Sequence, residues 1–265
     1  MRKAVCEGTD LPIRFTHPTL DNSPQKLYFG DEKLDRLFQG FRPGQIIYLH
    51  GSEKCLYLAE ILCVRAQLPV IKGGIDSKII FIDGGSGLDV SAVVALSRQS
   101  GQDKIAASRN IILSRAFTCF QLTNLIETRL GETLEDTASK LVVVSDFPVL
   151  YCDQGLEESI VREQFCRALT GLATIVKSKD AIALITSSRE EPKQAMTRIG
   201  LLLERRCNIA ARVVTRGSIT RVTLEKHPSA LLHSVDVSTV ADRILRSFLE
   251  TELEWEEQSP HTERL

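Results

Sequence analysis

Short apolar runs of four to six residues alternate along this 265-residue chain with helical patterns of ten or more residues. Parallel strands that are buried on both faces appear as continuous apolar runs, and each needs a long crossover to reach the next strand. The sequence therefore predicts an α/β fold with a mostly parallel central sheet and helices on both faces. The expected strands are 45–49, 78–83, 110–114, 141–144 and 181–186, and the expected helices between them are 56–67, 89–99, 120–130 and 156–178.

The two ends of the chain differ from this alternating part. Three prolines among polar residues predict an extended N-terminal arm over residues 1–26, and the core domain is expected over residues 27–228. Apolar residues spaced on one face predict a helix over 237–248, and an acidic stretch that contains Trp255 follows it. Residues 229–265 are thus expected to form a C-terminal helix and an acidic tail.

Two local patterns complete the expected core. Asp31 precedes apolar residues at helical spacing, which predicts a short capped helix that ends at Gly40. Two alternating runs, 210–215 and 218–225, flank a glycine-containing turn. This pattern predicts a C-terminal antiparallel hairpin added to the sheet.

Composition limits the possible classes of protein. Apolar residues make up 43% of the chain and charged residues 25%, which is typical of a globular protein. The formal net charge of −1 gives no general attraction to nucleic acid or to a membrane surface. No apolar run approaches the roughly 20 residues of a membrane-spanning helix, so no membrane partner is expected.

The cysteines and histidines are dispersed. The seven cysteines form no C-x-x-C pair, which indicates reduced thiols in an intracellular protein of the cytoplasm or nucleus. The five histidines show no paired spacing, so we expect no metal site.

A turn that carries Gly51, Ser52, Lys54 and Cys55 follows the first expected strand, where a phosphate-binding loop would lie. A P-loop, G-x-x-x-x-G-K-[ST], uses two glycines to wrap backbone N–H groups around phosphates, a lysine as a point charge and a hydroxyl to hold Mg²⁺. This turn has one glycine, its lysine follows three residues later, and a cysteine replaces the hydroxyl. Phosphate contact by Lys54 and an ordinary solvated lysine both remain open.

A second turn, Gly84 to Gly87, follows the strand that ends at Asp83. Glycine-rich turns between a strand and a helix can cradle a dinucleotide or S-adenosylmethionine at the helix N-terminus. Val90 stands where the third glycine of G-x-G-x-x-G belongs. A flexible turn without a ligand is the alternative.

Several strings resemble, in order and spacing, the RecA/RadA recombinase family, particularly its archaeal and eukaryotic branch and the divergent paralogues of that branch. The resemblance covers residues 27–228 and implies a RecA-like P-loop NTPase fold. The strings are residues 28–38, the helix 58–69, Gly73-Gly74 with the strand 78–83, Ser114-Arg115-Ala116-Phe117, and the strand 140–146.

The same resemblance implies a nucleotide site, and this sequence departs from the family at each part of it. The family strand that ends Asp-Thr-Glu carries the glutamate that orients the attacking water, and here it reads Asp83-Gly84-Gly85. Ser145 stands where the Mg²⁺-binding aspartate belongs, and Asp146 follows one residue later, which turns its side chain to the opposite face of a strand. The family's Thr-Asn-Gln is Thr186-Ser187-Ser188.

We therefore expect a vestigial nucleotide site, no catalytic residue and no bound cofactor, with ATP and Mg²⁺ as an open alternative. The residues of that site are Gly51, Ser52, Lys54, Cys55, Asp83 and Asp146.

The resemblance also implies two DNA-binding loops, 150–159 and 189–198. The first carries three acidic residues, which argues against phosphate contacts. The second supplies the candidate DNA-binding residues Arg189, Lys193 and Arg198. A further basic stretch that begins at Arg205-Arg206 either faces DNA or a partner or is a solvated face.

Two functions of different classes remain. In the first, the chain is a non-catalytic recombinase paralogue that acts in homologous recombination and DNA repair by docking on a recombinase or on a sister paralogue. In the second, it is a RecA-like ATPase that binds ATP through an unorthodox loop. DNA contact, direct or through the partner, is compatible with both.

Overall fold

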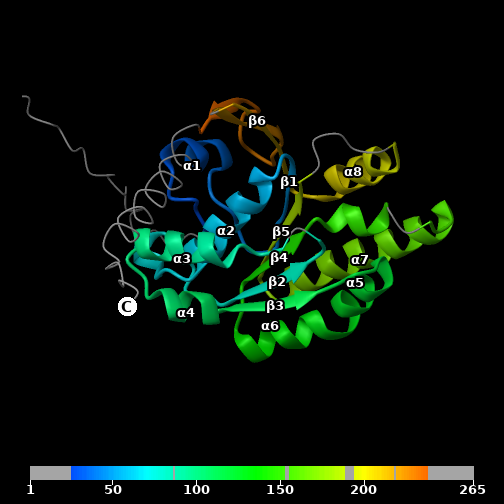
Figure 1. Ribbon diagram of the computed structural model, residues 1–265, viewed down its shortest axis with the longest axis horizontal. Helices are drawn as coiled ribbons and strands as arrows, with labels where there is room; N and C mark the ends of the chain where they lie inside the picture. The colour runs from blue at the N-terminus through cyan, green and yellow to red at the C-terminus, as the bar shows by residue number, and fades with distance from the viewer. Residues whose placement is uncertain (1–24, 86, 153–154, 189–193, 218, 238–265) are drawn as a thin grey trace, which may run out of the picture.

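The computed structural model describes residues 25–85, 87–152, 155–188, 194–217 and 219–237 (Figure 1). The expected arm, apart from its last two residues, and the expected helix 237–248 beyond Val237 lie outside these ranges.

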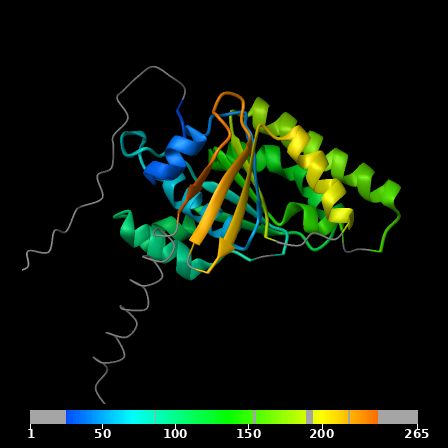
Figure 2. The same cartoon turned by 90° about the horizontal axis from the view of Figure 1, so that it is seen from above.

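Eight strands form a single sheet in the order β3-β2-β4-β5-β1-β6-β7-β8. Neighbours from β3 to β6 run parallel, whereas β6, β7 and β8 pair antiparallel. This topology confirms the predicted mostly parallel sheet with a hairpin at its C-terminal end, and Figure 2 shows the long β6–β7 pair. The strands are β1 (Ile46–Gly51), β2 (Ile79–Asp83), β3 (Ile111–Arg115), β4 (Leu141–Ser145), β5 (Ile182–Ser187), β6 (Ile209–Arg216), β7 (Ile219–Lys226) and β8 (Ser234–Asp236).

Helices cover both faces of this sheet (Figure 1). They are α1 (Glu32–Phe38), α2 (Lys54–Ala66), α3 (Val90–Gln99), α4 (Lys104–Arg109), α5 (Cys119–Leu125), α6 (Gly131–Thr137), α7 (Glu158–Ser178) and α8 (Gln194–Arg206). Two short 3₁₀ turns, η1 (Val70–Lys72) and η3 (Phe147–Tyr151), and one π-helical turn, η2 (Ile126–Leu130), complete the described elements.

Alternate residues of the strands point into two separate cores. On β4, Leu141 and Val143 pack with α1, α2 and α3, whereas Val142 and Val144 pack with α5, α6, α7 and α8. All five residues of β4 and all six of β5 are buried, which explains why these strands are continuous apolar runs in the sequence.

The expected cap of the first helix is confirmed. Asp31 accepts hydrogen bonds from the N–H groups of Lys33 and Leu34, each at 3.0 Å, and so satisfies two of the free donors at the start of α1. Beside this helix, Phe29, Phe38 and Phe41 form a buried aromatic cluster with ring centroids 5.3–5.5 Å apart. The cluster anchors the start of the core domain to the sheet.

The structure extends or changes several expected elements. The helix expected over 120–130 continues through the π-helical turn η2 into α6. The expected loop 189–198 is already helical from Gln194, where α8 begins. Residues 234–236 form β8, so the sheet continues past the expected boundary at residue 228.

Candidate functional site

The turn between β1 and α2 lies beside β6. Gly51 has φ +125°, and a Cβ at this position would lie 2.3 Å from the carbonyl oxygen of Val213 on β6. The side chain of Ser52 is buried, and its hydroxyl lies 3.3 Å from that of Thr215. The glycine therefore allows two strands to approach closely, a packing role that is independent of any phosphate.

This turn is short, and the helix that follows it uses some of its hydrogen-bonding groups. Only Ser52 and Glu53 separate β1 from α2. The N–H groups of Cys55 and Leu56 donate to the carbonyls of Ser52 and Glu53 at 3.0 and 3.1 Å, so the first turn of the helix uses them itself. The ammonium group of Lys54, the first residue of α2, lies 5.9 Å from the ring centroid of Tyr57.

Two cysteines of α2 lie in the core. Cys55 and Cys63 are fully buried in the core, and the six cysteines within the described ranges form no disulfide. Burial raises the pKa of the Cys55 thiol, and the nearby charge of Asp146 adds to this effect. Cys55 is therefore a core residue and not a replacement for a metal-binding hydroxyl.

Asp83, at the end of β2, is completely buried and bonded on both oxygens. Oδ1 accepts the N–H groups of Gly85 and Gly87 at 2.9 and 3.0 Å and the hydroxyl of Ser145 at 3.1 Å. Oδ2 accepts Nε of Arg115 at 2.7 Å. Burial alone would raise the pKa of Asp83, but these hydrogen bonds together lower it below its ordinary value.

The glycine-rich turn after β2 therefore encloses a carboxylate of the chain itself. A bound cofactor would need the N–H groups of Gly85 and Gly87, but both donate hydrogen bonds to Asp83. Gly84 is required for another reason, because a Cβ there would lie 2.4 Å from the carbonyl oxygen of Ser145. These contacts favour a turn without a ligand over a turn that cradles a cofactor.

Ser145 and Asp146 contact neighbours on opposite sides of the β4 tip. Asp146 lies beyond the last residue of β4, so the period of the strand does not set its direction. Ser145 reaches Asp83 on the β2 side. Asp146 has a left-handed backbone, φ 47°, and its Oδ1 accepts both the N–H and the hydroxyl of Ser188 on the β5 side, at 2.8 and 2.9 Å. Its own N–H donates to the hydroxyl of Thr186 at 3.2 Å.

These residues do not fit a magnesium-bound triphosphate. The structure brings Asp146 near Cys55 at the start of α2, whereas Asp83 lies on β2, which is separated from β1 by β4 and β5. Donors of the chain itself bind Asp83 on both oxygens and Asp146 on Oδ1. Within the described ranges, no group of three or more acidic, histidine or cysteine side chains could hold a metal ion.

Two clusters were not identified from the sequence. Arg115 was noted only as part of a family string, although Asp83 and Arg115 both end their strands, a signal that would have paired them once β2 and β3 were known to be neighbours. His50 and Arg212 both contact Glu225, each at 2.7 Å. Glu225 is the extra residue of a β-bulge in the β6–β7 pair, which no local pattern in the sequence indicated.

The candidate DNA-binding residues are only partly described. Arg189 and Lys193 lie outside the described ranges. Arg198, on α8, forms an ion pair with Glu158 of α7 at 2.7 Å, so its charge is already balanced. Both residues line a cavity of about 310 Å³ between α7, α8 and the end of η3.

The basic stretch after α8 is likewise partly balanced. Arg212 pairs with Glu225, and Arg221 pairs with Asp236 through two hydrogen bonds of 2.8 and 3.0 Å. These ion pairs favour a solvated face for this part of the hairpin.

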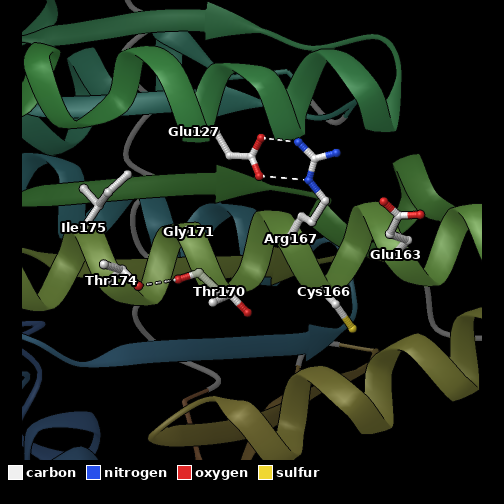
Figure 3. A pocket seen from close by; sticks show the side chains of 8 residues that line it. All are labelled: Glu127, Glu163, Cys166, Arg167, Thr170, Gly171, Thr174 and Ile175. Atoms are coloured by element: carbon white, nitrogen blue, oxygen red, sulfur yellow. Dashed lines mark hydrogen bonds and ion pairs between the residues drawn. The ribbon is translucent and has the colours of Figure 1, made fainter.

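A wider, open cavity of about 610 Å³ lies along the outer side of α7 (Figure 3). Glu127 of η2 and Arg167 of α7 form a two-bond ion pair across it, at 2.6 and 3.0 Å. Gly171 also lines the cavity, and a Cβ there would lie 3.4 Å from Ile126, an ordinary contact distance. Besides this ion pair, the lining carries the carboxylate of Glu163 and the free thiol of Cys166, and these groups are not arranged as a catalytic or metal-binding cluster.

The edge of the sheet at β3 exposes large apolar side chains. Leu113 on the strand is 55% exposed, and Phe117 and Phe120 just after it are 68% and 45% exposed. In the described sheet β3 pairs only with β2. An exposed apolar edge strand is a typical site for pairing with another chain.

Within the described ranges, no helix combines the length and the apolar character needed to span a membrane.

The comparisons with known proteins agree with this architecture. The meiotic recombination protein DLH1 of Candida albicans is 23% identical over 204 residues, which are 74% of this chain and 62% of that protein. The meiotic recombination protein DMC1 homolog A of Oryza sativa subsp. japonica is 30% identical over 132 residues, 49% of this chain and 38% of the relative. A DNA repair protein RAD51 homolog of Solanum lycopersicum is 25% identical over 123 residues, 42% of this chain and 36% of the relative.

The chain thus spans between about a third and two thirds of the length of these relatives. The Rad51 family model matches residues 25–231, which include every strand from β1 to β7. The fold is a RecA-like α/β fold, and the chain belongs to the Rad51 family.

Proposed function

We propose that this chain is a non-catalytic member of the Rad51 family that acts in DNA recombination and repair, in the nucleus or cytoplasm, by docking on a recombinase or on a sister paralogue. The relatives named above are meiotic recombination and DNA repair proteins, which supports the process. The observation that carries the non-catalytic role is that Asp83 and Asp146 both bind donors of the chain itself.

The β3 edge is the docking surface in this proposal. An extended segment of the partner would pair with the free side of β3, and its apolar side chains would cover Leu113, Phe117 and Phe120. Main-chain hydrogen bonds would provide affinity, and the exposed aromatic residues would provide the central anchors. DNA would be reached through the partner, with Arg189, Lys193 and Arg198 as candidates for direct contact.

Two measurements test the proposal. Titration of the purified chain with a fluorescent ATP analogue and Mg²⁺ should show no submillimolar binding, and an ATPase assay should show no turnover above background. Titration with the recombinase of the same organism should show saturable binding. Turnover that disappears in Asp146→Asn would contradict the non-catalytic role, and lack of binding to every recombinase and paralogue tested would contradict the docking role.

ATP binding through the unorthodox loop is the second candidate. Its support is the position of Lys54 at the first residue of α2, because a helix N-terminus favours anions. In this case the analogue should bind at submillimolar concentration, and Lys54→Ala should abolish that binding. Lys177→Ala, which removes an exposed lysine near the opposite end of a helix, is the matched control.

A further inference from the structure

Arg115 connects the buried tip of β2 with the exposed edge of the sheet. It is the last residue of β3 and stands opposite Asp83, the last residue of β2, in the parallel pairing of these strands. Its Nε and Nη2 lie 2.7 and 2.5 Å from Oδ2 of Asp83. The carboxylate is fully buried, whereas the arginine side chain is 53% exposed. One guanidinium therefore spans from the interior to the surface.

The inner end of this connection is fixed by several elements. Besides Arg115, Asp83 accepts two amides of the turn after β2 and the hydroxyl of Ser145 at the end of β4. A carboxylate that receives donors from three segments holds them at fixed positions, and because the bonds of such a network support one another, removal of one donor loosens the others.

The outer end supports the exposed aromatic residue of the edge. The guanidinium carbon of Arg115 lies 5.9 Å from the ring centroid of Phe117, within cation–π range. The N–H of Ala116 donates to the carbonyl of Asp83 at 3.0 Å, and the N–H of Phe117 donates to the side chain of Gln121 at 2.8 Å. The segment that carries Phe117 is thus bonded at successive residues to the β2 tip and to α5.

We propose that Arg115 and Asp83 are positioning residues that hold the β3 edge and Phe117 in one arrangement, ready for the partner without any bound nucleotide. The inference rests on the proposed function. Its basis is that every contact described above lies within the β2, β3, β4 and α5 segments, and none passes through the turn between β1 and α2. The affinity for the partner should therefore be the same with and without ATP and Mg²⁺.

The test uses three variants of the full chain. Arg115→Lys keeps the positive charge and removes the planar fork that reaches both Asp83 and Phe117. Phe117→Ala removes the exposed anchor and keeps the network. Arg221→Lys is the matched control, because Arg221 also pairs with one aspartate through two hydrogen bonds but lies at the opposite end of the sheet.

Hydrogen exchange of the free protein, read at the amides of residues 85, 87, 116 and 117, is the first measurement. We expect exchange to become at least about tenfold faster in Arg115→Lys and to stay unchanged in Phe117→Ala and Arg221→Lys. The second measurement is the affinity for the recombinase, with and without ATP and Mg²⁺. We expect about a tenfold loss in both Arg115→Lys and Phe117→Ala, no loss in Arg221→Lys, and no effect of the nucleotide.

The two measurements separate the two possible failures. Unchanged exchange in Arg115→Lys overturns the positioning role even if the partner binds. Faster exchange with unchanged affinity shows that docking does not need the fixed edge, and a tenfold gain in affinity on addition of ATP and Mg²⁺ refutes nucleotide independence. If the wild-type chain binds no recombinase, the proposed function and the docking part of this inference fail, while the exchange result still decides whether Arg115 fixes the edge.

Discussion

The two edges of the sheet differ in how they meet solvent. β8 has three residues, and its Asp236 is paired with Arg221 of the neighbouring strand. β3 has five residues and exposes Leu113, with Phe117 and Phe120 beside it. Short, charged edge strands resist pairing with another chain, whereas longer apolar edges favour it. In the described sheet, β3 is therefore better suited than β8 to pair with an added strand.

The largest expected effect comes from removal of the buried charge behind the β3 edge. Asp83→Ala leaves the amides of Gly85 and Gly87 and the guanidinium of Arg115 without their acceptor. Because Arg115 is half exposed, water screens part of its interaction with the carboxylate. We therefore expect the free energy of unfolding to fall by about 3 kcal/mol. Urea denaturation measures this change.

Asp236→Ala is the matched control at the other edge. Its pair with Arg221 is exposed, so the denaturation midpoint should stay at the wild-type value. If Asp83→Ala and Asp236→Ala lowered the free energy of unfolding equally, the buried contact at β3 would be no stronger than the exposed contact at β8.

A second buried carboxylate, Glu60 on α2, should titrate with the opposite sign to Asp83. It accepts the N–H of Asp89 at 2.8 Å, but burial raises its pKa from 4.5 to about 7. The folded protein therefore holds this proton more tightly than the unfolded chain, and stability falls as pH rises from 4.5 to 7. Glu60→Gln should gain on the order of 3 kcal/mol at pH 8 and nothing at pH 4.

Thermal denaturation of wild type and Glu60→Gln across this pH range tests the sign. Asp83 behaves in the other direction, since its pKa is lowered: its contribution is present above its ordinary value of 3.8 and is lost as pH falls through the folded-state value. A gain in Glu60→Gln that is as large at pH 4 as at pH 8 would show that ionisation is not its cause.

A charged side chain on β3 should hinder pairing of this edge with the partner. Leu113→Lys places a lysine on β3, and we expect the affinity for the recombinase to fall about tenfold, equivalent to about 1.4 kcal/mol. Leu232→Lys is a close control, because Leu232 is 58% exposed against 55% for Leu113 and precedes β8. Biolayer interferometry with the immobilised recombinase measures both, and similar losses would place the docking surface elsewhere.

The smallest effect is expected at the β8 edge. The hydroxyls of Thr223 and Ser234 lie 2.9 Å apart across β7 and β8 in an exposed position. Thr223→Val should change the free energy of unfolding by less than about 0.5 kcal/mol and leave recombinase affinity unaltered. Measurable loss of affinity in this variant would indicate that β8 contributes to docking.

Much of the fold could be predicted because long, buried strands and helices leave strong periodic patterns. The strand β8 could not, since Ser234-Val235-Asp236 is too short and polar to show a pattern. The helix α4 has six residues and was missed for the same reason. The helix α8, Gln194–Arg206, was not predicted, and the resemblance assigned its first residues to a loop.

Only part of the candidate site could likewise be predicted from the sequence. The position of Asp83 at the end of β2 follows from the apolar run before it and could be predicted from the sequence. The direction of Asp146 could not, because its left-handed backbone lies beyond the end of β4. The pairing of Asp83 with Arg115 depends on β2 and β3 being neighbours in one register, which a single sequence does not reveal. The resemblance to the RecA/RadA recombinase family was visible in the order of the strings, and the Rad51 family match confirms it. The loss of nucleotide binding stays a prediction.

The close approach of β1 to β6 at Gly51 has a consequence for the reading of genomes. Any larger residue would collide with the neighbouring main chain there, so selection for folding alone would preserve this glycine even in a family member that had lost ATP use. A survey that scores such a residue as a trace of nucleotide chemistry would count inactive members of the family among the active ones.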